Sequence, residues 1–444
     1  MVTEVGLNLE KGNALWERAK SVIPGGNGLI SKRPDRHVPD LWPPYFSKSK
    51  GCKLWDLDGN EFFDFSYMGL GASLLGYCDD FVDDAVRKAV SDGVSSTLNA
   101  PEEVLLAEKL LELHPFAGGV KFARSGGEAM AIAVRIARAF SGRETVAFSG
   151  YHGWSDWYLA ANLSDDDNLD GHLMPGLHPR GVPRSLFGTA IPFVYNDVEA
   201  FKQVVEGNKD IGVIVIEGAR NTLPSNEFLD EIEKISRERN IVVIWDEITS
   251  GWRITDGGVC KYLGREPDVV VYGKGLGNGY AISAILGKKE IMEEADQSFV
   301  SSTFWTERIG FSAALATIEK FISEKCWEKL IARGESIGCA FVEMAQRHQI
   351  DLSISEFKPL VGFSLNYGDN NAKILTLFAQ EMLKRGFLAG SSVYLSLAHT
   401  ENLIEEYLVA VEDCFQVISK GLSSGNIDDF LETCVRTTGF KRLT

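Results

Sequence analysis

Short apolar runs alternate with amphipathic helical patterns through the middle of the chain. The helical patterns at residues 128–140 and 228–239 each follow such a run. A strand that is apolar on both faces must be covered on both sides, which is typical of a buried and mainly parallel sheet. The alternation therefore predicts an α/β protein built from βαβ units. We expect its strands at residues 120–123, 145–148, 211–216, 241–245 and 269–272.

The pattern changes after about residue 310, where long helical stretches surround short apolar runs near residues 361–366 and 393–397. This second pattern is typical of an α+β domain. The first sixty residues are rich in turn signals and resemble an entry segment rather than an independent domain. We therefore expect an N-terminal segment at residues 1–60 that joins the small domain, a large α/β domain at 61–310 and a small α+β domain at 311–444.

The charge balance limits the partners of the chain. It has 45 Lys+Arg against 62 Asp+Glu, a net charge of −17, which disfavours binding to nucleic acid or to an anionic membrane. No run of about 18–20 apolar residues predicts a membrane span, and residues 1–13 lack the order of a signal peptide. The seven cysteines are scattered without a CxxC pair, which favours reduced thiols over a metal site. We expect a cytoplasmic protein that binds no nucleic acid, no membrane and no metal.

A glycine-containing turn separates the expected strand at 120–123 from the expected helix at 128–140. Its sequence is Arg-Ser-Gly-Gly-Glu, from Arg124 to Glu128. The first turn of a helix presents unpaired backbone N–H groups and the positive end of the helix dipole, which together suit a phosphate. The same residues also describe an ordinary strand-to-helix turn capped by Ser125. Both interpretations stay open for this motif alone.

Two carboxylates, Asp246 and Glu247, follow the apolar run at residues 241–245. In an open α/β sheet, ligands bind at the carboxyl ends of the strands. An apolar strand followed by Asp-Glu also describes the magnesium-binding strand of a nucleotide hydrolase, which needs an earlier GxxxxGK[ST] loop. Gly-Lys occurs only at residues 273–274 and 287–288, and neither pair is followed by Ser or Thr. The sequence therefore disfavours a P-loop enzyme.

A lysine, Lys274, follows the expected strand at 269–272 and has glycines on both sides. Most lysines are solvated surface groups, but a flexible turn after a buried strand lets the amine face a cleft. Desolvation there lowers the pKa of the amine and makes it a nucleophile toward carbonyls. Another strand end carries Tyr151 and His152, where an aromatic ring can stack on a planar ligand. A single histidine at such a place is more often structural than catalytic.

Together, these features meet the requirements of pyridoxal 5′-phosphate, which needs a lysine for its carbonyl, an acid for its pyridine nitrogen and a helix N-terminus for its phosphate. The order Ser-Gly, Tyr-His-Gly, Asp-Glu, Gly-Lys resembles that of class III (fold type I) aminotransferases over most of the chain. The pattern is nearest to the glutamate-1-semialdehyde 2,1-aminomutase branch. The resemblance implies a large pyridoxal-phosphate domain with a mainly parallel sheet, a smaller α+β domain and pyridoxal 5′-phosphate as the cofactor.

The resemblance also assigns roles to individual residues. Lys274 corresponds to the lysine that forms the Schiff base and moves the substrate proton, and Asp246 to the partner of the pyridine nitrogen. Thr303 corresponds to a threonine that reaches the phosphate of the neighbouring subunit, which implies a homodimer with shared active sites. The family's usual threonine in the phosphate loop is Gly127 here, so one hydroxyl donor is missing. The other expected cofactor contacts are Ser125, Gly126, Tyr151, His152, Glu217 and Ile248.

Three departures from the aminomutase pattern concern the substrate pocket. They lie at Ser391, at residues 31–33 and at residues 305–308. We therefore predict a transaminase that moves an amino group from a donor such as glutamate to a small polar carbonyl compound, with a sugar-like acceptor as one candidate. The alternatives are glutamate-1-semialdehyde 2,1-aminomutase and, further off, a fold type I decarboxylase or racemase. The residues expected at the substrate are Trp154, Arg308, Lys32 and Ser391, with Arg33 and Arg220 as further candidates for a donor carboxylate.

Overall fold

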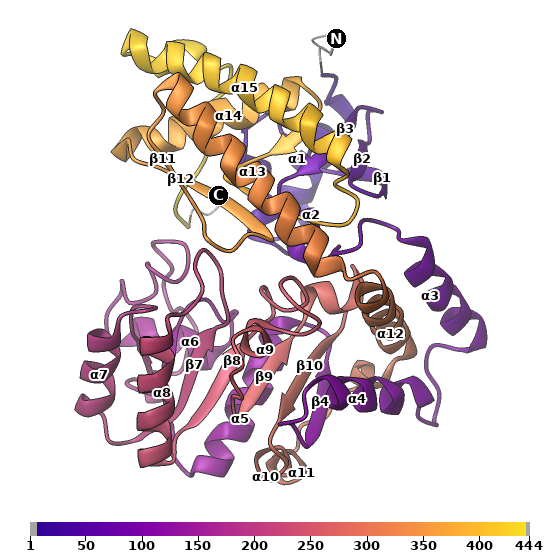
Figure 1. Ribbon diagram of the computed structural model, residues 1–444, viewed down its shortest axis with the longest axis vertical. Helices are drawn as coiled ribbons and strands as arrows, with labels where there is room; N and C mark the ends of the chain where they lie inside the picture. Colours follow the sequence, from indigo (N-terminus) through magenta and orange to yellow (C-terminus); the bar gives the residue numbers. More distant parts are fainter. Residues whose placement is uncertain (1–6, 441–444) are drawn as a thin grey trace. The chain divides into compact units, whose positions relative to one another are not determined.

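The computed structural model describes residues 7–440 of the chain. Within them the chain divides into two compact units (Figure 1). One unit is formed by the described residues up to Asp79 together with those from Lys329 onward, and the other is Asp80–Glu328. Each unit contains its own sheets and its own buried core, so the two are described separately.

A seven-stranded sheet forms the centre of the Asp80–Glu328 unit (Figure 1). Its strands are β4 (Gly119–Ala123), β5 (Thr145–Ser149), β6 (Ala190–Pro192), β7 (Ile211–Glu217), β8 (Val242–Asp246), β9 (Val269–Tyr272) and β10 (Ser283–Gly287). Their order across the sheet is β4-β10-β9-β8-β7-β5-β6. Neighbours from β9 to β6 are parallel, whereas β10 runs antiparallel to β9 and to β4. The predicted α/β class with a mainly parallel sheet is confirmed.

Helix α5 (Gly126–Ser141) packs against the strands from β7 to β10. Ala129, Ala133 and Ala137 recur every four residues along it and are fully buried, so the helix backbone can lie close to the sheet. Their neighbours in this core are the aliphatic side chains of the central strands. The other helices of the unit are α3 (Asp80–Asp92), α4 (Pro101–Leu113), α6 (Asp156–Leu159), α7 (Val198–Gly207), α8 (Asn226–Arg239), α9 (Val259–Tyr262), α10 (Lys289–Met292), α11 (Glu294–Gln297) and α12 (Arg308–Ser323).

The strands of the other unit form two small sheets. They are a four-stranded sheet of β1 (Phe46–Lys50), β2 (Lys53–Asp56), β3 (Glu61–Phe65) and β13 (Phe387–Ala389), and a three-stranded sheet of β11 (Leu352–Ile354), β12 (Leu360–Leu365) and β14 (Ser392–Tyr394). Because β13 pairs in parallel with β3, the two ends of the chain share one sheet. The helices are α1 (Glu10–Val22), α2 (Met68–Gly71), α13 (Cys326–His348), α14 (Asn371–Lys384) and α15 (Glu401–Ser424).

The division between the units falls after Asp79 and after Glu328, whereas the sequence predicted breaks after residues 60 and 310. Strand β3 belongs with the C-terminal part because it pairs with β13. At the other break, α12 packs against α3 and α4, which keeps it with the seven-stranded sheet (Figure 1). Contacts between segments that lie far apart in the sequence therefore set both breaks, and local patterns do not reveal such contacts.

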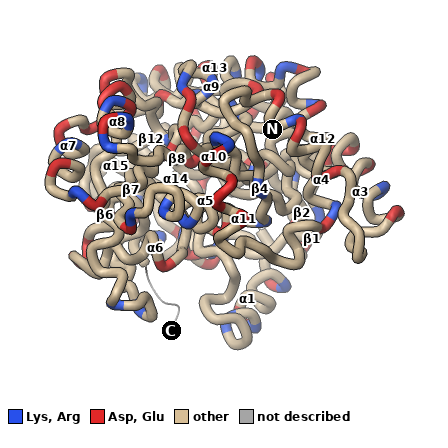
Figure 2. The backbone as a smooth tube through the Cα atoms, turned by 90° about the horizontal axis from the view of Figure 1, so that it is seen from below, with Lys and Arg blue, Asp and Glu red and all other residues tan. Residues whose placement is uncertain are grey.

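Charged residues of both signs are interspersed along the chain, for example on α8 (Figure 2). Within residues 7–440 no helix is long and apolar enough to cross a membrane. The same part of the chain contains no group of three or more His, Cys, Asp or Glu side chains that could hold a metal ion.

Candidate active site

Three parallel strands bring ionisable side chains to one edge of the large sheet. Glu217 is the last residue of β7 and lies opposite Asp246, the last residue of β8. Lys274 follows β9 after a single glycine. The carboxyl ends of parallel strands meet at the same edge of a sheet, which is where such folds bind ligands. The acid and the amine expected from the sequence are therefore brought together by the topology.

Lys274 is the first residue of a short 3-10 helix, Lys274–Gly277, and has a φ of 44°. A positive φ is uncommon for a residue with a side chain and often marks a functional position. Its Nζ donates a hydrogen bond to Thr249 Oγ1 at 2.7 Å. Burial, together with the positive charges of Arg220 and Arg253, lowers the pKa of Lys274 to about 8. Near pH 8 much of the amine is therefore neutral and able to act as a nucleophile or base.

Asp246 is held in place by a histidine and by a backbone amide. His152 Nδ1 lies 2.8 Å from Asp246 Oδ2, and the amide of Ile248 donates to Oδ1 at 3.0 Å. The other ring nitrogen of His152 lies 3.1 Å from the carbonyl oxygen of Ser149. The histidine ring is buried, with 1% of its surface exposed. Because both of its nitrogens face oxygen atoms, the ring orientation is fixed, and so is the carboxylate beside it.

The first two residues of α5 are glycines, and neighbouring side chains fill the space that a larger residue would need there. A Cβ atom added to Gly126 would come within 2.9 Å of Ile248 Cδ1, and one added to Gly127 would come within 2.8 Å of Trp154 Nε1. Ser125 precedes the helix, and its hydroxyl donates to Glu128 Oε2 at 3.1 Å. The backbone at the helix start, with its free N–H groups and positive dipole, therefore suits a phosphate.

Ile248 connects the start of α5 with the lysine turn. Besides Gly126, its side chain lies near Gly273, where an added Cβ would meet Ile248 Cγ2 at 3.4 Å. An aliphatic group between a phosphate site and a lysine suits packing against a flat ring. Tyr151, the aromatic expected on the opposite face, is 37% exposed. The Arg220 guanidinium carbon lies 5.8 Å from the centre of its ring.

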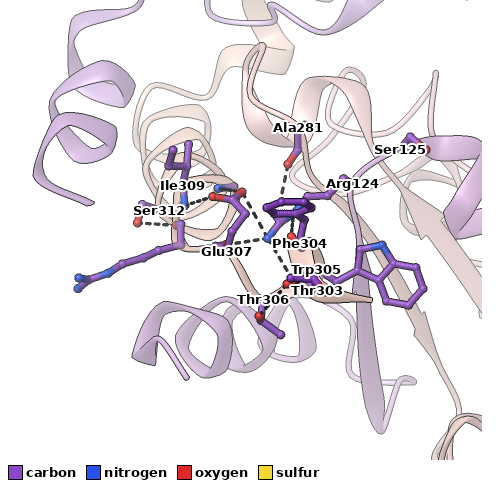
Figure 3. A network of polar contacts seen from close by, with 12 residues as sticks. Arg124, Ser125, Ala281, Thr303, Phe304, Trp305, Thr306, Glu307, Ile309 and Ser312 are labelled. Atoms are coloured by element: carbon purple, nitrogen blue, oxygen red, sulfur yellow. Dashed lines mark hydrogen bonds and ion pairs between the residues drawn. The ribbon is translucent and has the colours of Figure 1, made fainter. Parts of the chain in front are cut away.

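Thr303 begins a second short 3-10 helix, Thr303–Thr306. Arg124, which directly precedes the phosphate-loop candidate, binds this segment, and Figure 3 shows its side chain among the segment's carbonyl groups. Its Nε donates to the Phe304 carbonyl at 2.6 Å, and its Nη2 donates to the Trp305 carbonyl at 3.0 Å. Arg124 thus ties the turn before α5 to the segment that carries Thr303. This role of Arg124 was not predicted, although the sequence places an arginine between a buried strand and a glycine turn.

The residues predicted at the substrate are not brought together at one sheet edge, as the predicted acid and amine are. Arg308 donates to Glu102 through Nε at 2.9 Å and through Nη2 at 2.7 Å, so its guanidinium is held by a carboxylate of the protein. This arrangement does not support the predicted role of Arg308 in binding a donor. Lys32 ends a 3-10 helix, Ile30–Lys32, and Ser391 lies just before β14, both in the other unit. Their substrate roles stay predictions.

Two neighbours of Lys274 were not assigned to it from the sequence, namely Thr249 and Arg253. Arg253 is 1% exposed, and its Nε donates to the Thr249 carbonyl at 2.7 Å. Both residues lie in the loop that follows Asp246 and Glu247. The sequence offered one sign of their role, because both residues belong to a polar loop that directly follows the paired carboxylates.

Comparison with known proteins provides an independent test of the family. The model of the aminotransferase class III family matches residues 37–381. The 3-aminobutyryl-CoA aminotransferase of Cloacimonas acidaminovorans is 30% identical over 426 residues, which cover 91% of this chain and 98% of that protein. The glutamate-1-semialdehyde 2,1-aminomutase of Ruminiclostridium cellulolyticum is 31% identical over 427 residues, covering 90% and 96%. The FumI protein of Sphingopyxis sp. MTA144, solved in its PLP internal aldimine form, is 27% identical with a TM-score of 0.83, over 93% of this chain and 97% of that one.

Proposed function

The chain belongs to the class III aminotransferase family, and we propose that it moves an amino group from a donor such as glutamate to a small polar carbonyl compound. It is a transaminase that depends on pyridoxal 5′-phosphate. The observation that carries the proposal is the setting of Lys274, whose pKa is lowered to about 8 at the sheet edge that also carries Asp246. A partly neutral amine beside an acid is what amino transfer requires.

The residues at this edge suit each part of the cofactor. Gly126 and Gly127 open α5, where the backbone N–H groups of the helix start would hold the phosphate. The carboxylate of Asp246 would hold a protonated pyridine nitrogen by its negative charge. Lys274 would bond to the carbonyl carbon, and Ile248 and Tyr151 would pack on the two ring faces.

When bound, the cofactor supplies an electron sink for the pair left behind when the donor loses its Cα proton. The donor's amino group would replace Lys274 at the carbonyl carbon. The released amine would then be the base for that proton, because its lowered pKa leaves much of it unprotonated near pH 8. Thr249 Oγ1 accepts from Nζ at 2.7 Å and holds the amine at the sheet edge. Asp246, whose carboxylate is oriented by His152, would keep the proton on the pyridine nitrogen. Positioned proton transfer contributes about 10²–10⁴-fold to a rate.

Arg220 is the cation best suited to bind the carboxylate of an amino donor. Its charge lowers the pKa of Lys274, so it lies close enough to act on the amine. Its Nη2 donates to Glu217 Oε1 at 2.8 Å, and its side chain is 41% exposed. A guanidinium has five N–H groups in a planar fork, which suits it to binding carboxylates. A donor held there would have its amino group near Lys274.

A homodimer with shared active sites is part of the proposal. Large apolar side chains near Thr303 are exposed, with 89% of the surface of Phe299 and 68% of that of Phe304 accessible. Exposed apolar side chains of this size often mark a protein interface, and a second copy of the chain is the proposed partner. Thr303 would then reach the cofactor phosphate of that copy. We also place the enzyme in the cytoplasm, which is supported by seven cysteines that form no disulfide within the described residues.

The aminomutase stays as a second candidate because one of the similar relatives carries that activity. An aminomutase moves the amino group within one molecule, whereas the proposed transaminase needs a separate donor and acceptor. The two activities therefore differ in stoichiometry, which can be measured without knowing the natural acceptor.

The test incubates the purified holoenzyme with single amino acids and no acceptor, and measures the keto acid formed per active site. We expect about one equivalent of 2-oxoglutarate from glutamate or of the matching keto acid from another donor, and multiple turnovers once an aldehyde or sugar-like ketone is added. Conversion of glutamate-1-semialdehyde to 5-aminolevulinate without any donor would contradict the proposal. Release of carbon dioxide, or racemisation without keto acid, would indicate a decarboxylase or a racemase instead.

A further inference from the structure

The indole ring of Trp154 lies against the second residue of α5. A Cβ atom added to Gly127 would come within 2.8 Å of Trp154 Nε1 and 3.1 Å of Cδ1. Real Cβ atoms essentially never approach other atoms to less than 3.0 Å. The indole therefore occupies the space that any side chain larger than glycine would need at this position.

The loop around Trp154 is fixed against the start of the helix on both sides. A Cβ added to Gly153 would meet Gly127 Cα at 3.1 Å. On the other side, the hydroxyl of Ser155 donates to the Gly127 carbonyl at 3.4 Å. The indole thus reaches Gly127 from a backbone that packs on the same glycine, although 69% of the tryptophan surface is exposed.

The edge of the indole that faces Gly127 is its polar edge. An indole N–H can only donate a hydrogen bond, so the Trp154 atom nearest to the Gly127 position is a donor. The hydroxyl of Ser125, the other side-chain donor at this turn, is engaged by the carboxylate of Glu128. The indole N–H of Trp154 is therefore a second side-chain donor at the start of α5.

We propose that the indole N–H of Trp154 donates a hydrogen bond to the phosphate of the cofactor and replaces the hydroxyl group that Gly127 lacks. This inference rests on the proposed placement of the phosphate at the start of α5. It assigns Trp154 to the cofactor rather than to the substrate. It also explains why glycine stands at position 127, since a hydroxyl-bearing side chain and the indole would compete for one space.

The test measures cofactor affinity rather than turnover. Apoenzyme of the full chain is titrated by equilibrium dialysis with pyridoxal 5′-phosphate and with pyridoxal, which lacks the phosphate. Trp154→Phe keeps a ring but removes the N–H, so we expect it to weaken binding of the phosphorylated form by about tenfold or more. Binding of pyridoxal should stay near the wild-type value. Trp327→Phe, a tryptophan that contacts Phe321 instead, should change neither affinity.

A second pair of variants exchanges the two donors. Gly127 has a φ outside the left-handed region, so its backbone accepts threonine, but Gly127→Thr alone should weaken binding because the new side chain meets the indole. Combined with Trp154→Ala, the same threonine gains room and supplies a hydroxyl. We expect the double variant to bind the phosphorylated cofactor more tightly than either Gly127→Thr or Trp154→Ala, which is a non-additive result.

Two outcomes would overturn the inference. If Trp154→Phe keeps the wild-type preference for pyridoxal 5′-phosphate over pyridoxal, the N–H does not bind the phosphate, although the phosphate site itself stands. Equal weakening of both ligands would mean that the indole acts by ring packing alone. If the wild-type apoenzyme shows no preference for the phosphorylated form, the proposed phosphate site at α5 is wrong as well.

Discussion

The proposed cofactor edge and the residues predicted at the substrate are held by the fold in different ways. Asp246 and Glu217 end neighbouring parallel strands and are 6% and 8% exposed, and Lys274 follows the next strand. Trp154 instead lies on a loop with 69% of its surface exposed, and Arg308 begins a helix with its guanidinium bound by a carboxylate. The first group is positioned by a buried sheet, and the second by individual side-chain contacts.

This difference suggests that the two groups of residues control different properties of the enzyme, namely the rate of the chemical step and the choice of ligand. A residue at the end of a buried strand moves only if the sheet moves, so its position is set by many contacts at once. A loop residue is set by a few contacts, which one substitution can replace. Substitutions at the strand ends should therefore change the rate of the chemical step, whereas substitutions among the loop and helix-start residues should change which molecule binds.

The largest effect is expected for Lys274→Ala. The substitution removes the proposed base, so the rate of keto-acid formation in a single turnover should fall by at least about 10²–10⁴-fold even with the cofactor in excess. The covalent link should also be lost, which mass spectrometry after borohydride reduction would detect. Lys288→Ala is the matched control, because this lysine also follows a glycine but bonds to Asp268 Oδ1 at 2.7 Å. A reduced adduct that persists in Lys274→Ala would exclude Lys274 as the linking residue.

A smaller loss of the single-turnover rate is expected for Asp246→Asn. The amide keeps the shape of the carboxylate but removes its charge, so the proton on the pyridine nitrogen loses its partner. The loss of a charge-assisted hydrogen bond of this kind should lower the rate by about 10–100-fold. The single-turnover assay measures this rate. Asp268→Asn is the matched control, because Asp268 bonds to the Val243 amide at 2.8 Å at the opposite end of β8. If Asp246→Asn turned over as fast as this control, the carboxylate would have no part in the chemical step.

Much of the large sheet was predictable from the sequence, because its central strands are continuous apolar runs of a length that only a buried strand explains. The run at 211–216 is strand β7 (Ile211–Glu217), and the run at 241–245 is β8 (Val242–Asp246). Strand β10 (Ser283–Gly287) was missed because it follows a glycine-rich stretch that gives no periodic signal. The breaks between the units were placed differently because one depends on the pairing of β3 with β13 and the other on the packing of α12 against α3 and α4.

The candidate site was predictable where a motif lies directly at a strand end. Asp246 and Lys274 follow buried runs, so the topology of a parallel sheet is enough to bring them to one edge. The hydrogen bond between His152 and Asp246 joins residues 94 positions apart, and no local pattern encodes it. For the same reason the sequence did not reveal that Arg308 is bound by Glu102, which lies 206 positions away.

The smallest effects are expected for two arginines, Arg220 and Arg308, which were both candidates for binding the donor carboxylate. Arg220→Gln removes the proposed contact to the donor carboxylate near Lys274. The KM for the best carboxylate-bearing donor should therefore rise by about tenfold, whereas kcat should change less. Steady-state kinetics with that donor measures both constants. An unchanged KM would mean that another cation holds the donor.

Arg308→Gln is the counterpart and should leave the KM for the same donor near the wild-type value. Its guanidinium is bound to Glu102 within the protein, so its loss should lower the midpoint of thermal unfolding rather than donor affinity. Glu102→Gln breaks the same pair from the other side and should lower the midpoint similarly. A rise in KM for Arg308→Gln without a matching rise for Glu102→Gln would mean that the arginine leaves this pair to bind the substrate. The start of α12, where Arg308 lies, would then form part of the substrate pocket. Arg308 would bind substrate and would not act only in stabilising the fold.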